Sequence, residues 1–174
     1  MPFGVTNGPP TFQCLMNSVF SGPNRKFVIT FLDDILVFSQ TLQDHVEHLR
    51  TVFGILRQNQ LYAKESKCSF AQPSIEYLGH IISREGVATD PSKTSAMRAW
   101  PTPTNATELR GFLGLTGYYR KFVPRYGILA KPLTQLLTKK GFVWTEQAQT
   151  AFEHIKTAMV STPVLALPDF SRPF

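Results

Sequence analysis

The chain has 174 residues, of which 43% are hydrophobic, and this is enough to bury a core in one or two domains. No apolar run approaches the ~20 residues that cross a bilayer, and no basic and apolar leader precedes Pro2, so we expect neither a membrane span nor a secretory signal. The two cysteines, Cys14 and Cys68, lie far apart and lack metal-ligand spacing, which indicates reduced, buried or half-buried thiols in an intracellular protein.

The net charge of +6 is concentrated in the second half of the chain. Residues 1–90 hold seven Lys and Arg against eight Asp and Glu, whereas residues 91–174 hold eleven against four. This asymmetry favours a polyanionic partner for the second half. A solubilising surface is the alternative interpretation.

The N-terminal residues predict a loop followed by a helix. Residues 2–10 are rich in Pro and Gly. From about Thr11 to Phe20 the apolar residues recur at helical spacing, which predicts a buried stripe of Phe12, Leu15, Met16 and Val19.

Residues 27–38, FVITFLDDILVF, are the most informative stretch. The β-branched and aromatic flanks predict two short buried strands that meet at an acidic turn, Asp33-Asp34. Neighbouring carboxylates repel, which raises the pKa of at least one of them unless a cation compensates. Because Mg²⁺ binds one or two carboxylates together with phosphate oxygens, the turn is a candidate metal platform for phosphoryl transfer. The alternative is a solvated hairpin turn.

Residues 41–60 predict an amphipathic helix. Thr41 and Asp44 resemble a capping box, and the expected apolar stripe is Leu42, Val46, Leu49, Phe53 and Leu56. His45 and His48 do not have the spacing of a zinc-protease helix, so we expect them on a solvated face. Residues 61–70 predict a short strand-like or irregular stretch.

Residues 75–82, IEYLGHII, predict a single strand in which Gly79 permits close backbone approach. Residues 83–86 then supply the turn of a second hairpin. Judged alone, His80 would be a structural histidine.

The remaining residues are mainly helical in pattern. Asp90-Pro91 starts a helix to about Trp100, Asn105 and Glu108 start one to about Phe122, and Thr145 caps one to about Val160. Residues 126–137 predict a further helix, interrupted near Pro132. The final helix has an expected stripe of Ala148, Phe152, Ile155 and Met159, and residues 162–174 look extended.

Glycines recur at positions 111, 114 and 117 in the helix after Asn105. Such glycines permit close approach either of a partner helix or of a nucleic-acid backbone. The basic residues Arg110, Arg120, Lys121 and Arg125, together with Tyr118 and Tyr119, surround them.

Several motifs, taken in order, resemble a reverse transcriptase of the gypsy-type LTR-retrotransposon class. They are PFGVTNGPPTFQ (2–13), FLDD (31–34), YLGH (77–80), LRGFLG (109–114) and LALPD (165–169), and together they cover essentially the whole chain. The resemblance implies an α+β fold. Residues 1–90 would be a partial polymerase palm of antiparallel hairpins with helices, residues 91–140 a helical thumb, and residues 141–174 the start of a connection toward a ribonuclease H domain.

The same resemblance implies an RNA-directed DNA polymerase. The primer 3′-hydroxyl would attack a deoxynucleoside triphosphate with the help of Mg²⁺ or Mn²⁺ on an RNA or DNA template-primer. Ribonuclease H and integrase domains would be partners in the full polyprotein. The expected location is a cytoplasmic particle or the nucleus, with no membrane association.

The resemblance also assigns roles to individual residues. Asp33 would be the main metal ligand and Asp34 the second, and Lys67 would be a general acid at the leaving pyrophosphate, with Lys64 as the second choice. Nucleotide and template contacts would come from Phe3, Gly4, Asn7, Gln13 and Phe31, where Phe31 replaces the more common Tyr. The primer grip would be Tyr77, Leu78, Gly79 and His80, and the thumb contacts would be Arg110, Gly111, Gly114, Arg120 and Lys121.

The sequence departs from the family pattern in one respect. The family uses three catalytic aspartates, and the first of them lies on a strand upstream of residues 2–4. The fingers subdomain of the family also lies upstream of these residues. We therefore expect these 174 residues to be a truncated and inactive fragment of the enzyme. The alternatives are a non-catalytic nucleic-acid-binding module and a decayed retroelement remnant with an exposed sheet edge.

Overall fold

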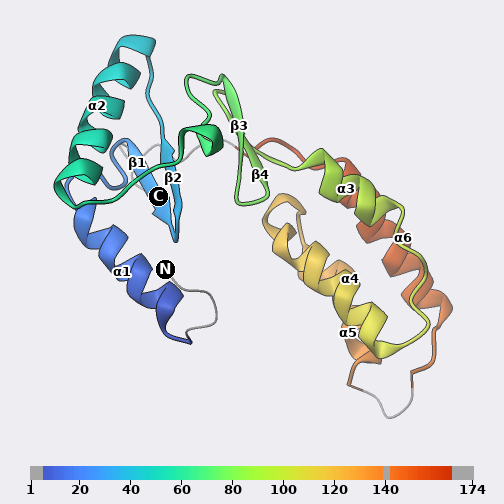
Figure 1. The fold of residues 1–174 in the computed structure, drawn as a ribbon. Helices are drawn as coiled ribbons and strands as arrows, with labels where there is room; N and C mark the ends of the chain where they lie inside the picture. The colour runs from blue at the N-terminus through green and yellow to red at the C-terminus, as the bar shows by residue number, and fades with distance from the viewer. Residues whose placement is uncertain (1–5, 139–141, 166–174) are drawn as a thin grey trace. The chain divides into compact units, whose positions relative to one another are not determined.

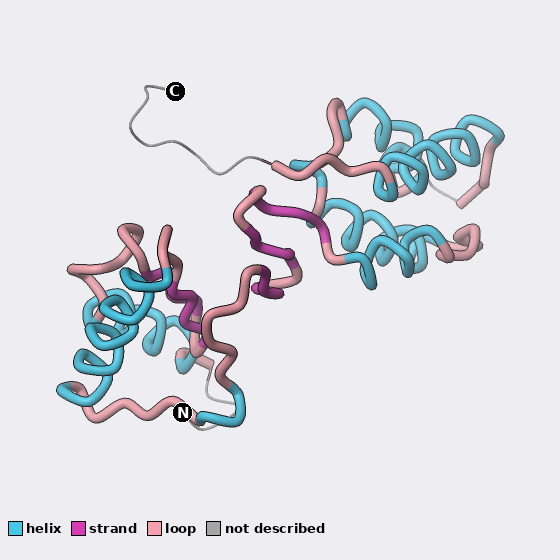
Figure 2. The backbone as a smooth tube through the Cα atoms, turned by 90° about the horizontal axis from the view of Figure 1, so that it is seen from above, coloured by secondary structure: helices cyan, strands magenta, loops and turns pink. Residues whose placement is uncertain are grey.

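The protein is described by a computed structural model that covers residues 6–138 and 142–165. The chain forms two compact units, Met1–Gln72 and Pro73–Phe174, called here the N-terminal and C-terminal units. Helices and antiparallel strands occur in both, which confirms the α+β prediction (Figure 1, Figure 2). This division falls at a different point from the functional boundaries expected after residues 90 and 140, which stay predictions.

The N-terminal unit places one hairpin against two helices. Helix α1 (Gly8–Val19) packs on strand β1 (Val28–Phe31), and helix α2 (Leu42–Gln58) packs on strand β2 (Asp34–Val37). A single 3-10 turn, η1 (Glu65–Lys67), follows. The buried core of the unit is Met16, Phe20, Val28, Val52 and Leu56.

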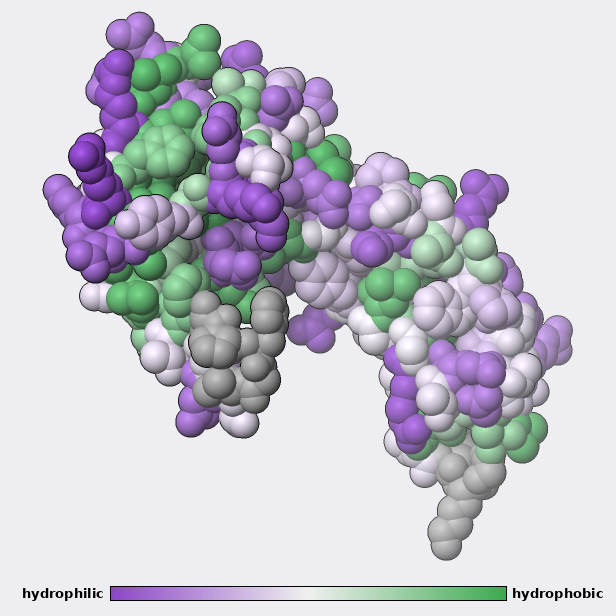
Figure 3. Space-filling view, viewed as in Figure 1, coloured by the Kyte–Doolittle hydropathy of each residue, from purple (hydrophilic) through white to green (hydrophobic). Residues whose placement is uncertain are grey.

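The two strands of the hairpin are unevenly buried. In β1, Val28 and Thr30 are buried, whereas Ile29 and Phe31 are 40% and 49% exposed. The expectation of two buried strands is therefore wrong for Ile29 and Phe31, because a two-stranded sheet covered mainly on one side leaves part of its other face in solvent. Leu36, the ladder partner of Ile29, is buried on that face. Figure 3 shows hydrophobic residues on the surface of this unit, at the left of the view.

Helix α2 begins as predicted but faces the core differently. The Thr41 Oγ1 accepts a hydrogen bond from the Asp44 N–H at 3.1 Å, which confirms the cap. The expected stripe is wrong in part, since Leu42, Val46 and Phe53 are exposed and the buried residues are Val52 and Leu56. The buried face is therefore rotated relative to the predicted stripe, with Val52 buried in place of Phe53.

The C-terminal unit begins with a three-stranded antiparallel sheet in the order β3-β4-β5. The strands are β3 (Ser74–Tyr77), β4 (His80–Ser83) and β5 (Gly86–Thr89). The single strand expected over residues 75–82 is wrong, because the chain reverses at Leu78 and Gly79. Both have positive φ, 50° and 72°, as a two-residue type I′ turn requires.

Four helices follow the sheet in the described part of the C-terminal unit. They are α3 (Pro91–Arg98), α4 (Ala106–Tyr118), α5 (Tyr126–Leu136) and α6 (Glu146–Val160), with a 3-10 turn, η2 (Arg120–Phe122), between α4 and α5. Their shared core includes Met97, Leu109, Phe112, Phe152 and Ile155. The expected stripe of α6 is buried throughout, which confirms it.

Helix boundaries in this unit follow local chemistry with two exceptions. Side chains of Asp90, Asn105 and Thr145 cap their helices as predicted. The helix after Asn105 ends at Tyr118 instead of running to Phe122. Helix α5 continues through Pro132, so the expected interruption is wrong. The proline cannot donate to the carbonyl of Ile128, a residue that is 69% exposed.

The last described residues return to the sheet. Leu165 forms an antiparallel bridge with Val87, through N–H to O distances of 2.8 and 2.9 Å. The basic turn at residues 139–141 and the expected extended segment at residues 166–174 lie outside the described residues. None of the described helices is long and apolar enough to cross a membrane.

Candidate functional site

The acidic turn lies at the tip of the β1–β2 hairpin. Phe31 pairs with Asp34 in the ladder, so Leu32 and Asp33 form the turn itself. Leu32 has a φ of 50°, a left-handed conformation that costs free energy for any residue with a Cβ. Asp33 and Asp34 are both exposed, and neither forms an ion pair within residues 6–138 and 142–165.

These two carboxylates fit the requirements of a divalent cation in part. Free carboxylate oxygens are hard ligands of the kind that Mg²⁺ binds, and it needs only one or two of them when phosphate oxygens complete its shell. No group of three or more His, Cys, Asp or Glu able to hold a metal occurs among the described residues. Among the described residues the turn therefore offers two carboxylates to a cation, and metal binding by Asp33 and Asp34 stays a prediction.

Gln13 of α1 binds the turn that carries the carboxylates. Its Oε1 accepts from the Leu32 N–H at 2.6 Å, and its Nε2 donates to the Thr30 carbonyl at 3.3 Å and to Asn17 Oδ1 at 2.9 Å. The sequence assigned Gln13 to nucleotide or template contact, and that role stays a prediction. Its bridge to the hairpin was missed, because no local pattern signals a partner nineteen residues away.

The base of the hairpin is fixed by α2. The His48 ring stacks on the Phe27 ring with centroids 3.9 Å apart and planes 4° apart. Ser39 Oγ lies 2.7 Å from His48 Nδ1 and 3.2 Å from His45 Nδ1. The expectation of a solvated face is therefore wrong for His48, since the end of the hairpin covers it.

The other expected residues of this unit are placed as follows. Asn7 is the exposed N-cap residue of α1 and its side chain makes no capping bond. Lys64 and Lys67 are exposed around η1, where the Lys67 N–H donates to the Lys64 carbonyl. Phe3 and Gly4 lie outside the described residues. The roles assigned to these residues stay predictions.

In the C-terminal unit, the expected primer-grip residues form the β3–β4 turn. Tyr77 pairs with His80, and Leu78 and Gly79 lie between them. The Tyr118 hydroxyl donates to the Leu78 carbonyl and the Tyr119 hydroxyl to the Gly79 carbonyl, both at 2.6 Å. These contacts from α4 were not foreseen from the sequence, because they join residues forty positions apart.

His80 is enclosed by aromatic rings of the same unit. Its ring stacks on Tyr118 at 5.2 Å and meets Tyr119 edge-on at 5.4 Å. Burial, together with the positive charge of Lys121, lowers the pKa of His80, which favours a neutral imidazole. Burial, followed by the negative charge of Asp90, raises the pKa of Tyr119 to about 12, so its hydroxyl remains a donor at neutral pH.

Helix α4 presents an exposed face that carries basic residues and glycines. Arg110, Gly114 and Gly117 follow each other at helical spacing. A Cβ built on Gly114 or Gly117 would meet no atom within 4 Å, whereas one on Gly111 would lie 3.5 Å from the Trp100 ring. A separation of 3.5 Å is an ordinary van der Waals contact, so packing at the Cβ position requires none of the three glycines, and Gly114 and Gly117 leave open surface. Arg120 and Lys121 are exposed just beyond the helix.

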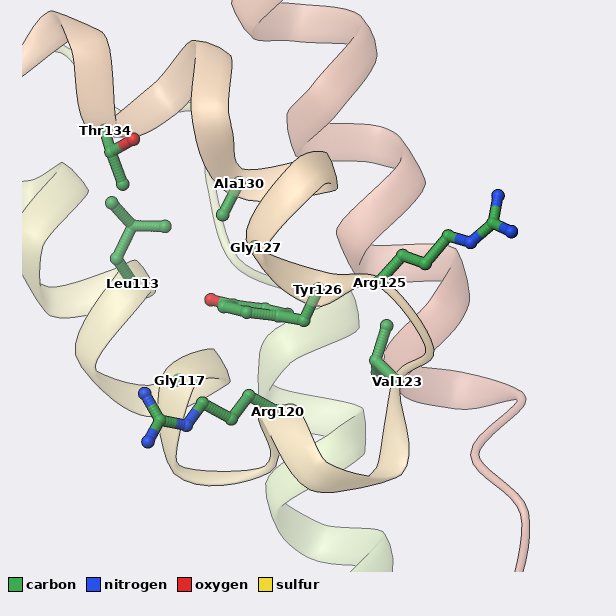
Figure 4. A pocket seen from close by; sticks show the side chains of 9 residues that line it. All are labelled: Leu113, Gly117, Arg120, Val123, Arg125, Tyr126, Gly127, Ala130 and Thr134. Atoms are coloured by element: carbon green, nitrogen blue, oxygen red, sulfur yellow. The ribbon is translucent and has the colours of Figure 1, made fainter.

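A cavity of about 600 Å³ lies beside this face, between α4, η2 and α5. Figure 4 shows the Tyr126 ring across its centre, with the guanidinium groups of Arg120 and Arg125 extending in different directions. The Tyr126 hydroxyl lies 2.7 Å from Thr116 Oγ1. The cavity therefore has an aromatic floor and a basic rim.

The chain thus combines an acidic antiparallel hairpin, supported by two helices, with a basic C-terminal unit. Comparison with known proteins identifies the class of protein that has these features. Residues 1–82 match the family described as reverse transcriptase (RNA-dependent DNA polymerase). These residues therefore match a reverse transcriptase domain, and the chain as a whole is homologous to a segment of retrotransposon Pol polyproteins.

Curated relatives extend the similarity beyond residue 82. The chain is 56% identical over 131 residues to an uncharacterized mitochondrial protein of Arabidopsis thaliana, covering 74% of this chain and 83% of that protein. It is 40% identical over 176 residues to the retrovirus-related Pol polyprotein from transposon 297 of Drosophila melanogaster, covering 100% of this chain and 17% of the polyprotein. The Tf2-3 transposon polyprotein of Schizosaccharomyces pombe is 35% identical over 173 residues, and the chain covers 13% of it. The chain thus spans less than a fifth of these polyproteins.

Solved structures agree with the sequence relatives. The foamy viral protease-reverse transcriptase in complex with dsDNA has a TM-score of 0.86 at 25% identity, over 99% of this chain and 37% of that one. The same viral protein in complex with an RNA/DNA hybrid has a TM-score of 0.82 at 25% identity, over 95% of this chain and 23% of that one.

Proposed function

We propose that these 174 residues supply the metal-binding hairpin and the duplex-binding helices of an RNA-directed DNA polymerase from a gypsy-type LTR retrotransposon. One observation carries the proposal. Two exposed carboxylates, Asp33 and Asp34, without an ion pair among the described residues, occupy a turn whose left-handed backbone is held by Gln13. Strain that a neighbouring side chain supports is characteristic of functional turns.

In this proposal the chain contributes ligands and orientation to nucleotidyl transfer. When bound, Mg²⁺ or Mn²⁺ lowers the charge cost of bringing a 3′-hydroxyl to a triphosphate. Asp33 and Asp34 hold the cation, and Gln13 keeps the turn in the conformation that presents them. Exposed Lys67 carries an ammonium group that can donate a proton to pyrophosphate as a general acid, and Phe31, 49% exposed, offers a flat surface to the nucleotide.

The C-terminal unit would bind the template-primer. Its basic residues, its open glycine surface on α4 and the β3–β4 turn suit contacts to phosphate and sugar rather than to base edges. In a full polyprotein, ribonuclease H and integrase domains would accompany it, and the protein would act inside the cell. With two carboxylates present, the 174 residues alone would not catalyse primer extension.

Primer extension tests the catalytic proposal. Three proteins are compared on a primed RNA template with Mg²⁺ or Mn²⁺: the chain alone, the chain joined to the segment that precedes the matching region in a homologous Pol polyprotein, and the joined form with Asp33→Asn. We expect extension only from the joined form, and a loss of about a thousandfold in the variant. Asp44→Asn, an exposed carboxylate on α2, is the matched control.

Two results would contradict this proposal. Extension by the chain alone would show that the two carboxylates suffice. Equal rates for the joined form and its Asp33→Asn variant would remove the assigned role of the acidic turn.

The exposed face of α4 favours a second candidate, a nucleic-acid-binding module without catalysis. This face of α4 carries Arg110, Gly114 and Gly117, and η2 adds Arg120 and Lys121. Such residues bind phosphate without a metal ion. Fluorescence anisotropy with duplexes of two unrelated sequences separates the candidates. Removing charge at Arg120 and Lys121 should weaken both complexes alike and reduce the salt dependence, whereas Lys131→Gln on α5 should change little. If the duplexes bind normally but the joined form above never extends a primer, the binding module is the better account.

A further inference from the structure

Two neighbouring tyrosines of the C-terminal unit bind two successive carbonyls of one turn. The Tyr118 hydroxyl donates to Leu78 and the Tyr119 hydroxyl to Gly79, each at 2.6 Å, a short distance for a hydroxyl donor. We call this pair of hydrogen bonds the tyrosine clamp. It joins the end of α4 to the β3–β4 turn across forty residues of sequence.

The turn needs such support because of its backbone. Leu78 has a φ of 50° and Gly79 a φ of 72°. Glycine adopts this conformation without cost, but leucine does not, and type I′ turns normally place Asn, Asp or Gly at that position. Hydrogen bonds to both turn carbonyls therefore stabilise a conformation that the sequence alone disfavours.

The space around the turn is also closely fitted. A Cβ on Gly79 would lie 3.3 Å from the Tyr119 hydroxyl, so a side chain there would press on the clamp. Tyr119 is 1% exposed, which fixes its ring, whereas Tyr118 is 53% exposed. The His80 ring lies against both, at 5.2 and 5.4 Å between centroids.

We propose that Tyr118 and Tyr119 are positioning residues that hold the β3–β4 turn at a fixed place beside the basic face of α4. The two surfaces then meet a nucleic acid together, with phosphates of a duplex on Arg120 and Lys121 and a recessed primer 3′ end at the turn. This inference rests on the proposed function, because it takes the turn to contact the primer end. A purely structural tether would stabilise the unit without affecting which duplex end is bound.

The first test asks whether the hydroxyls hold the turn. Tyr118→Phe, Tyr119→Phe and the double variant keep the rings and remove only the two donors. We expect amide hydrogen exchange of residues 74–83 to become about tenfold faster or more in the double variant, since two hydrogen bonds are lost. Tyr126→Phe is the matched control: it removes a hydroxyl bonded to Thr116 in the same unit but away from the turn. Unchanged exchange in the double variant would refute the clamp.

The second test separates positioning from tethering. The full chain is titrated with a duplex that has a recessed 3′ end and with a blunt duplex of the same number of phosphates. We expect the unmodified chain to prefer the recessed end several-fold, and the double variant to lose that preference while binding the blunt duplex within about twofold and with the same salt slope. Faster exchange with an unchanged preference would overturn the positioning role.

Failure of the proposed function has a different outcome. An unmodified chain that binds neither duplex, or binds both equally, would refute contact of the turn with the primer end, and the positioning role with it. A failure confined to the variants would refute the inference alone.

Discussion

Replacing Gln13 by methionine removes the bridge between α1 and the acidic turn while keeping the length of the side chain. Two hydrogen bonds to the hairpin backbone are lost, to the Leu32 N–H at 2.6 Å and to the Thr30 carbonyl at 3.3 Å. At about 1 kcal/mol each, the hairpin should lose ~2 kcal/mol of local stability. A change of about 1.4 kcal/mol corresponds to a tenfold change in an equilibrium constant, so the equilibrium constant for local opening of the hairpin should rise about 30-fold.

Hydrogen exchange over residues 28–37 measures this change directly. Exchange in the C-terminal unit serves as an internal reference, because Gln13 and its hydrogen-bond partners Asn17, Thr30 and Leu32 all lie in the N-terminal unit. Asn17→Ala is the matched control, since it removes a partner of the Gln13 amide without touching the hairpin. If exchange in the hairpin rises less than about threefold in Gln13→Met, the left-handed turn is stable without the bridge and the reasoning fails.

Three further predictions concern the C-terminal unit. Burial lowers the pKa of His80 from 6.5, so the unfolded chain binds a proton at this histidine more tightly than the folded chain does. The contribution of neutral His80 to the free energy of unfolding should therefore be fully present above pH ~6.5 and be lost as the pH falls from there through the lowered pKa. His80→Phe should flatten this dependence in chemical denaturation at pH ~5 and ~7.5, and an unchanged slope would assign it to other groups. Gly114→Ala should raise helix stability by about 0.5–1 kcal/mol, yet weaken duplex binding if nucleic acid approaches that open surface; tighter or equal binding would contradict this. The Phe152 side chain is fully buried, so Phe152→Ala should destabilise the unit by about 3–5 kcal/mol. Unfolding can be monitored by the fluorescence of Trp144, whose ring centroid lies 5.8 Å from that of Phe152. A loss under about 1 kcal/mol would show that the core collapses to fill the space left by the removed ring.

Local chemistry accounts for the features that the sequence predicted well. The caps at Thr41, Asp90, Asn105 and Thr145 depend on a side chain and an N–H two or three residues away. Such short-range geometry is set by the residue type itself. The acidic turn was located for the same reason, since apolar flanks define where the strands must reverse.

Long-range contacts explain what the sequence left out. Gln13 and Leu32, and Tyr119 and Gly79, are brought together only by the tertiary fold. The β3–β4 turn was read as continuous strand because Leu78 carries no turn signal, and its left-handed backbone is supported from α4. The misplaced stripe of α2 has a related cause: which helical face is buried depends on what the hairpin offers to it.

The central claim is that the Asp33-Asp34 turn is a cation platform. NMR spectra of the chain during titration with Mn²⁺ and a deoxynucleoside triphosphate test it most directly, because paramagnetic broadening detects weak sites. The account predicts that amide signals of residues 31–35 broaden first, before those near the exposed acids Asp44 and Glu47, and that Asp33→Asn abolishes this preference. Broadening that begins at α2, or that is unchanged in Asp33→Asn, would show that the turn does not bind the metal.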